Sequence, residues 1–330
     1  MSTSKLVSKA PEFRKSFTLS SLPNARRVDV KQWFPRHMFA SLKKMQAKLR
    51  SIDFVVEVHD ARIPLSGRNR QLRNTLFAIR PHLLLLNKAD LVDRKYYGPA
   101  EAKLRSEDPL LQHIIWGSMK HRQKEICYQI RDLIVDEVSS SDRFNRAEID
   151  HYNVMVVGIP NVGKSTLMNG LRRHILSMRE VAPVGDRPGV TTSVQERMRI
   201  NDKPPIYVLD TPGILAPHSE DLETALKMAL CHVTRDHLAG PINLADYLLY
   251  WCNRNGQHSA VQRLLELTEP SDQILEVLLH LAARRNMITL QPQLDGSRRP
   301  VAQLEAAASA FVAMFRRGEL GRLMLDVIPS

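Results

Sequence analysis

The sequence predicts an α/β fold in which a mostly parallel sheet with covering helices is followed by a small all-α domain. Three observations predict it. Short apolar runs alternate with helical or loop segments along the first two thirds of the chain. One of these runs leads into a glycine-containing loop and then a helix. After about residue 220 the strand-like runs give way to leucine-rich helical periods.

Length and composition are those of a soluble globular protein of about two domains. The chain has 330 residues, of which 43% are hydrophobic and 25% charged, and this argues against a mostly disordered chain. No apolar run approaches the roughly 18–20 residues that a membrane-spanning helix needs. Cys127, Cys231 and Cys252 are too few and too scattered for a disulfide framework or a metal site, so we expect buried thiols in a reducing compartment.

The first 50 residues carry most of the positive charge. They hold twelve basic and two acidic side chains, which is ten of the chain's formal net charge of +12. Residues 1–28 are also rich in Ser and Thr and lack an apolar core, which is typical of a mitochondrial presequence. A nucleic-acid-binding tail or a merely solvated basic tail has the same composition. The charge therefore predicts a targeting segment, a phosphate-binding arm or both.

Residues 29–220 combine an amphipathic helix with five apolar runs. From Trp33 to Arg50 apolar side chains recur at spacings of three and four, opposite a basic face. The runs that follow are short and read as buried strands of one parallel sheet. They are Ile52–Val58, Leu83–Leu86, Ile114–Trp116, Val154–Val157 and Ile206–Leu209.

Residues 221–330 read as an all-helical domain. Leucine-rich periods with helical spacing replace the strand-like runs. They are Leu222–Leu230, Ala245–Trp251, Val261–Leu267, Ile274–Ala283 and Val301–Phe315.

The segment Gly158–Ser165 matches the phosphate-loop pattern GxxxxGK[ST]. It follows one predicted strand and precedes a predicted helix, which is the context that this pattern requires. Backbone N–H groups and the helix N-terminus would hold phosphate oxygens, Lys164 would reach the β- and γ-phosphates, and Ser165 would bind Mg²⁺. The residues expected to contact the nucleotide here are Asn161, Val162, Gly163, Lys164, Ser165 and Thr166.

A second motif, Asp210-Thr-Pro-Gly213, ends the last predicted strand. Asp210 would hold Mg²⁺ through water, and the amide of Gly213 would meet the γ-phosphate. Between the two motifs, Thr191 is the favoured residue to complete the Mg²⁺ shell, with Thr192 as the alternative.

The base-reading motif is Asn87-Lys88-Ala89-Asp90, at the end of the Leu83–Leu86 run. The Asp90 carboxylate can accept from both N1–H and N2–H₂ of guanine, whereas adenine would leave this buried carboxylate unpaired. Lys88 can lie along the base while Asn87 braces the loop. Gly117 and Ser118 follow the next predicted strand and would close over the guanine.

The order of these motifs is unusual, because the base-reading loop precedes the phosphate loop, whereas an ordinary small GTPase has the reverse order. This order, with the segments Gln32–Met38 and His59–Asn69, closely resembles the circularly permuted GTPases that assist assembly of the large ribosomal subunit. The family is typified by the bacterial ribosome biogenesis GTPase A. The resemblance runs from about Trp33 to the helical stretch Ala225–Leu249.

The resemblance implies a P-loop GTPase fold with permuted motif order and an enzyme that hydrolyses GTP. Ile214 stands where many GTPases place the glutamine that orients water. Two substitutes are implied by the family: His37, swinging toward the γ-phosphate on the ribosomal subunit, and Asn161, ligating K⁺ beside the β/γ bridge. The cofactors expected are thus Mg²⁺ and K⁺. Packing at a helix start for His37 and loop bracing for Asn161 stay open.

The resemblance, with the presequence-like N-terminus, implies a mitochondrial matrix protein that binds GTP and GDP. Its expected partners are the mitochondrial large ribosomal subunit and its rRNA, contacted by residues 221–330. We expect a monomer, a role in translation regulation, and a charge that also suits the matrix face of the inner membrane. Ile214 favours one alternative, an rRNA-binding scaffold that senses GTP with little hydrolysis. An ATPase is disfavoured by the Asn87–Asp90 motif.

Overall fold

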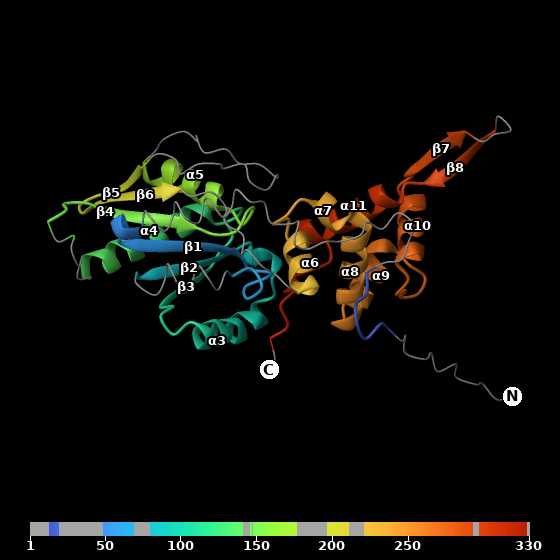
Figure 1. Ribbon diagram of the computed structural model, residues 1–330, viewed down its shortest axis with the longest axis horizontal. Helices are drawn as coiled ribbons and strands as arrows, with labels where there is room; N and C mark the ends of the chain where they lie inside the picture. The colour runs from blue at the N-terminus through green and yellow to red at the C-terminus, as the bar shows by residue number, and fades with distance from the viewer. Residues whose placement is uncertain are drawn as a thin grey trace. The chain divides into compact units, whose positions relative to one another are not determined.

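The computed structural model describes residues 13–19, 49–68, 80–140, 146, 148–176, 197–210, 221–292 and 297–328. The chain divides into two compact units. The sheet unit comprises residues 29–238 and 322–330, and the helical unit comprises residues 1–28 and 239–321. Figure 1 shows the strands of the large sheet side by side in the first unit and a group of packed helices in the second.

The predicted boundary at residue 220 differs from the structure in two places. The chain leaves the sheet unit at residue 238, so α6 (Leu222–Leu230) belongs with the sheet although it is leucine-rich. Residues 322–330 return to the sheet unit at the other end of the chain. Local composition identifies a helix but does not say which unit the helix packs against, so neither difference could be read from the sequence.

A six-stranded sheet forms the centre of the sheet unit, in the order β3-β2-β1-β4-β6-β5. All neighbouring strands are parallel except β5 and β6, which form an antiparallel pair. The five predicted strands are confirmed, and β5 is an addition. The strands are β1 (Phe54–Asp60), β2 (His82–Asn87), β3 (His113–Trp116), β4 (Tyr152–Val157), β5 (Met198–Asp202) and β6 (Pro205–Asp210).

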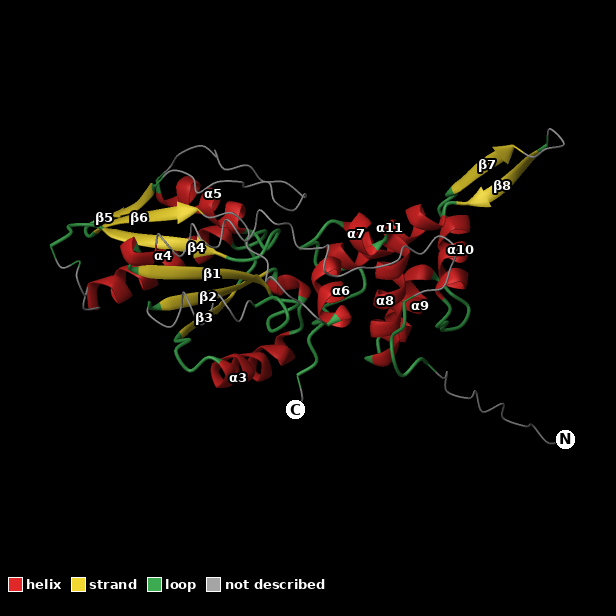
Figure 2. Ribbon diagram, in the orientation of Figure 1, coloured by secondary structure: helices red, strands yellow, loops and turns green. Residues whose placement is uncertain are grey.

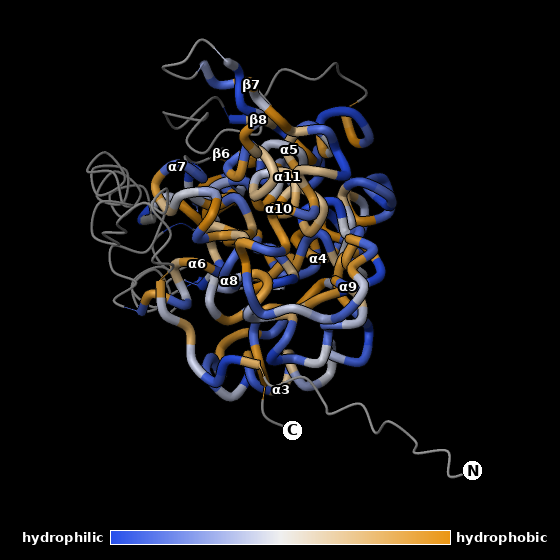
Figure 3. The backbone as a smooth tube through the Cα atoms, turned by 90° about the vertical axis from the view of Figure 1, so that its right-hand side faces the viewer, coloured by the Kyte–Doolittle hydropathy of each residue, from blue (hydrophilic) through white to orange (hydrophobic). Residues whose placement is uncertain are grey.

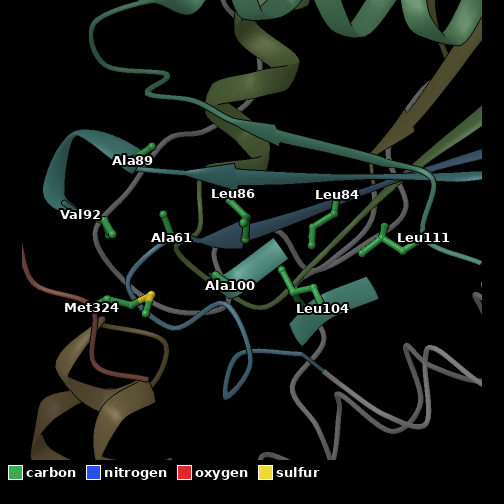
Figure 4. Close-up of a cluster of buried hydrophobic side chains, with 9 residues drawn as sticks. All are labelled: Ala61, Leu84, Leu86, Ala89, Val92, Ala100, Leu104, Leu111 and Met324. Carbon is green, nitrogen blue, oxygen red and sulfur yellow. The ribbon is translucent and has the colours of Figure 1, made fainter. Parts of the chain in front are cut away.

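One face of the sheet is covered by α3 (Tyr97–Glu107). Its Ala100 and Leu104 are fully buried in a cluster with Leu84 and Leu86 of β2, as Figure 4 shows. Residues two apart on a strand point to the same face, which is why these two leucines face the same helix. Short 3₁₀ turns connect β2 to α3: η4 (Ala89–Leu91) and η5 (Arg94–Tyr96).

The opposite face is covered by α4 (Gln123–Ser140) and α5 (Lys164–Ile175), which pack against each other. The contact is close at Gly170 of α5, where a Cβ atom would lie 2.8 Å from Sγ of Cys127. Cys127, like Cys231 and Cys252, is buried, as predicted. Figure 2 shows these helices in red against the yellow strands.

The helical unit is built around α8 (Pro241–Arg254), which is buried along nearly its whole length. It packs against α11, with α9 and α10 beside it, and Figure 3 shows orange, hydrophobic segments near the label of α10. The other elements are α7 (Asp236–Ala239) at the boundary, α9 (His258–Leu265), α10 (Ile274–Arg284), α11 (Leu304–Arg317), β7 (Ile288–Pro292) and β8 (Arg298–Ala302).

The hairpin of β7 and β8 corrects the expectation of a purely helical domain. It extends beyond the helices of its unit in Figure 1, and all of β7 is exposed. Residue 301 begins a predicted helical period but lies in β8, and α11 starts at Leu304. Within the described residues, no helix is both long and apolar enough to cross a membrane.

Candidate nucleotide-binding site

The predicted phosphate loop connects β4 to α5, as the motif requires. Gly158 has φ +150° and Gly163, the residue before α5, has φ +106°. A Cβ atom at Gly158 would lie 2.2 Å from the carbonyl oxygen of Val58, and one at Gly163 would lie 2.3 Å from Nδ2 of Asn87. Both positions therefore require glycine for conformation and for space.

Lys164, the first residue of α5, folds back over this loop. Its side chain is 7% exposed, and Nζ donates a hydrogen bond of 2.8 Å to the carbonyl oxygen of Ile159. Ser165 and Thr166 follow on the first turn and are half-buried. The first N–H groups of a helix have no acceptor within the helix, so this turn supplies donors and partial positive charge for an anion.

Asn87 joins three loops at the end of the sheet. Its Nδ2 donates to the carbonyl oxygen of Val162 in the phosphate loop at 2.7 Å, and its Oδ1 accepts from the amide of Met119 at 2.9 Å. The amide of Gly117 donates to Leu86, and the carbonyl oxygen of Gly117 accepts from Ala89. The base-reading loop, the phosphate loop and the loop after β3 are thus held together by one buried side chain and its neighbours.

Lys88 makes a second link between the same loops. Its Nζ donates to the carbonyl oxygen of Asn161 at 2.9 Å and forms an ion pair of 2.9 Å with Asp60 Oδ2. Asp60 ends β1 and is fully buried. Burial would raise the pKa of Asp60, but Arg62 and then Lys88 outweigh it and hold that pKa well below its ordinary value.

Asp90 lies in η4, and its side chain is 28% exposed, whereas the base-reading motif predicts a buried carboxylate. The ring of His121 lies beside Asp90, with 3.5 Å between Nε2 and Oδ2. Ser118 is buried, and its carbonyl oxygen accepts from the amides of His121 and Arg122. The carboxylate is therefore open to a ligand while the loop after β3 lies beside it.

Asn161 has a left-handed backbone conformation, with φ +59°. Its Nδ2 donates a hydrogen bond of 2.8 Å to the carbonyl oxygen of His232, between α6 and α7. The phosphate loop is thus connected to the segment that follows the Asp210–Gly213 motif. No motif in the sequence predicts this contact.

Comparisons with known proteins show which family the chain belongs to. A family model described as 50S ribosome-binding GTPase matches residues 153–286. Mitochondrial GTPase 1 of Aedes aegypti is 42% identical over 300 residues, covering 90% of this chain and 94% of the relative. Mitochondrial ribosome-associated GTPase 1 of Mus musculus is 43% identical over 307 residues, covering 92% of each chain. The chain belongs to the mitochondrial ribosome-associated GTPase family.

Solved structures support the fold of this GTPase. The GNP-bound YlqF of T. maritima superposes with a TM-score of 0.53 at 20% identity, covering 87% of this chain and 97% of that one. This likeness confirms the P-loop GTPase fold predicted from the sequence, with a mostly parallel sheet and helices on both faces.

The described part of the candidate site brings several of the predicted residues together. Asn87, Lys88, Gly117, Asn161 and Gly163 lie in one connected group of loops, as the distances above show. Asp210 ends β6, and its backbone pairs with Val156 of β4, the strand that leads into the phosphate loop. His37, Thr191, Thr192, Gly213 and Ile214 lie outside the described residues.

Two residues near the site were missed by sequence reasoning. Asp60 stands in the His59–Asn69 segment, but nothing in the sequence showed that its carboxylate reaches Lys88. His121 follows Gly117 by four positions and carries no motif of its own. Asp60 ends β1, which pairs with β2, and Lys88 follows β2 directly, so the pairing of these two strands is what brings the two side chains together.

Proposed function

We propose that this chain is a Mg²⁺-dependent enzyme that binds and hydrolyses GTP and assists assembly of the mitochondrial large ribosomal subunit. One observation carries the nucleotide part of the proposal. Asn87 and Lys88 of the base-reading loop both bind backbone carbonyls of the phosphate loop, so base recognition and phosphate binding belong to one site. The names of both relatives support the mitochondrion as its place of action, and the name of the Mus musculus relative supports the ribosome.

The proposed site is that of a GTPase with permuted motif order. The base-reading loop follows β2 and the phosphate loop follows β4, although β1 lies between these strands in the sheet. Parallel strands end at the same edge of a sheet, so the order of the loops along the chain does not alter the pocket. The phosphates would lie on the first turn of α5, and the base would lie against Lys88 with its edge on Asp90.

Mg²⁺ is proposed to be held by Ser165, Thr191 and Asp210. Hydroxyl and carboxylate oxygens are the ligands that this ion prefers. The described residues fit the ion, since Ser165 stands on the first turn of α5 and Asp210 ends the strand beside β4. Bound there, Mg²⁺ would neutralise charge on the β- and γ-phosphates.

K⁺ is proposed as a second cation at Asn161. The amide nitrogen of Asn161 donates to the carbonyl oxygen of His232, and an amide oxygen is an acceptor of the kind that can bind a cation. A positive charge beside the bridging phosphate oxygen can raise the hydrolysis rate by about 10³–10⁵-fold in related chemistry. Potassium dependence of turnover would be the sign of this role.

Water activation is proposed to depend on the ribosomal subunit. The side chain of Ile214 cannot hydrogen-bond to water, and His37 in the basic N-terminal segment is the proposed substitute when the subunit is bound.

Subunit binding is proposed to involve the basic N-terminal segment and the helical unit. Basic side chains such as Lys43, Lys44 and Lys48 would contact rRNA phosphates. The helical unit would add further subunit contacts, and the protein would act as a monomer in the matrix, where its charge also suits the inner-membrane surface.

GTP turnover with and without purified mitochondrial large subunits, in potassium and in sodium, tests the proposal. We expect slow turnover by the chain alone and strong stimulation by the subunit, greater in potassium. Ser165→Ala should remove the stimulated rate at any magnesium concentration. Subunit binding without stimulation would instead support the GTP-sensing scaffold that Ile214 favours.

A further inference from the structure

Residues Phe13–Leu19 are part of the helical unit, although they lie inside the presequence-like segment 1–28. The segment is held by its backbone at two places. The amide of Arg14 donates to Asp272 Oδ2 at 2.7 Å, and the carbonyl oxygen of Lys15 accepts from Tyr250 at 3.4 Å and Arg254 at 3.2 Å. These partners are more than 230 positions away in the sequence, so the contacts are tertiary.

The Arg14 guanidinium pairs with two carboxylates of the helical unit. Nη2 lies 2.8 Å from Asp246 Oδ1, and Nε lies 3.1 Å from Asp272 Oδ2. Asp246 is in the middle of α8, and its side chain is only 2% exposed. Burial raises the pKa of Asp246, and Arg14 offsets part of that effect by stabilising the carboxylate. A buried carboxylate that loses its cation is strongly destabilising.

Two aromatic side chains anchor the segment on either side of Arg14. The ring of Phe17 packs edge-on against Tyr247, with centroids 5.1 Å apart, and lies 5.5 Å from the ring of Tyr250. Phe13 packs against His258 at 5.3 Å. Tyr247 and Tyr250 are among the largest fully buried side chains of α8, so Phe17 rests on the core of the unit.

We infer that Phe13–Leu19 is retained in the working protein as a strap on the helical unit, and that any leader removed from the N-terminus ends before Phe13. Cleavage near residue 28 would take away both aromatic anchors and leave Asp246 without Arg14. The presequence-like composition therefore describes a removable part of twelve residues at most, followed by a structural part. Composition could not separate the two because both are basic.

Chains that begin at Phe13 and at Ser20 test the strap directly. The chain from Phe13 should melt like the full chain, and the chain from Ser20 should melt at least about 5 °C lower. The inference is overturned if the chain from Ser20 melts with the full chain, or if both shortened chains are destabilised equally.

Point variants of the full chain carry the same test if the shorter chain does not fold. Arg14→Ala should lower the melting temperature, whereas Lys15→Ala, which removes the same charge from an exposed neighbour, should not. Adding Asp246→Asn to Arg14→Ala should recover part of the loss, because it removes the buried charge. Equal effects of Arg14→Ala and Lys15→Ala would contradict the inference.

The N-terminal peptide of the protein isolated from mitochondria gives an independent readout. Mass spectrometry should find a first residue at or before Phe13. A first residue after Phe13 would show that the strap is removed, and would overturn the inference.

Discussion

At the residue scale, the side-chain amide of Asn87 contacts backbone groups of two different loops. It satisfies the carbonyl oxygen of Val162 and the amide of Met119, and both are backbone groups of loops that would surround a nucleotide. The sequence motif predicted that Asn87 braces the loop. It did not predict which atoms Asn87 would contact, because those atoms belong to loops 32 and 75 positions further along the chain.

Asn87→Ala should weaken GDP and GTP binding by about 10- to 100-fold, because two buried backbone groups lose their partner. Isothermal titration measures this loss. Asn153→Ala is the matched control, since Asn153 is also buried but lies at the start of β4 and binds the carbonyl oxygen of Ser51. If both variants bind nucleotide with wild-type affinity, Asn87 does not organise the site.

Asp90→Asn should weaken GTP binding by about 10- to 100-fold and shift preference toward xanthine nucleotides, because an amide cannot accept both guanine protons. Competition between GTP and XTP measures the change. Asp93→Asn, three positions away and on the solvent side, should leave both affinities unaltered. Unchanged GTP affinity in Asp90→Asn would remove the base-reading role from this residue.

At the scale of elements, strands that consist of an apolar run could be predicted from the sequence, and strands that mix polar and apolar residues could not. β5 has the sequence Met-Arg-Ile-Asn-Asp at the sheet edge, in which polar residues separate the apolar ones, so no apolar run marks it. The C-terminal segment returns to the sheet through Asp326, which accepts from the amides of Leu65 and Ser66. The contacting residues are more than 250 positions apart, and a single Asp in the sequence does not predict such a contact.

β1 also carries a buried charge, Glu57, that the apolar pattern around it concealed. Burial would raise the pKa of Glu57, but Arg68 and then His59 outweigh burial and lower that pKa from 4.5 to about 2. Arg68 Nη2 lies 2.9 Å from both Glu57 and Asp108. A carboxylate with a lowered pKa stabilises the fold fully above its unfolded pKa, and this contribution disappears as the pH falls through the folded pKa.

Glu57→Gln should therefore be less stable than the wild type at pH 7, and the difference should shrink as the pH falls from about 4.5 toward 2. Urea unfolding across this pH range measures the two free energies. Glu125→Gln, an exposed carboxylate paired with Arg122, should follow the wild-type curve. A constant difference between Glu57→Gln and wild type across the range would show that the charge of Glu57 is not what stabilises the fold.

At the scale of the whole molecule, motif order predicted which loops meet, but not how the chain is shared between units. The GTPase motifs predicted the strands of the sheet unit that precede them, because each motif follows the end of a strand. The return of residues 322–330 and the attachment of Phe13–Leu19 to the helical unit depend on tertiary contacts between distant positions. The spacing of hydrophobic residues and the composition of a segment predict local structure, so they do not predict such contacts.

His37→Ala tests the proposed dependence of hydrolysis on the subunit. GTP affinity and basal turnover should be nearly unchanged, and the subunit-stimulated rate should fall by about 10²–10⁴-fold, the usual effect of losing one positioning group. The stimulated rate is measured at saturating subunit, so that weaker docking does not imitate the loss. Full stimulation of the variant would leave His37 as a packing residue, and an equal fall in both rates would show that the subunit does not bring it into place.

The central claim is that loops out of their usual order along the chain form one guanine-nucleotide site. Equilibrium titration of the full-length protein with GTP, GDP and ATP in magnesium tests it most directly. We predict that GTP and GDP bind at one shared site, and that ATP binds at least about 10²-fold more weakly because it cannot satisfy Asp90. Equal affinity for ATP and GTP, or no competition between GTP and GDP, would contradict the account.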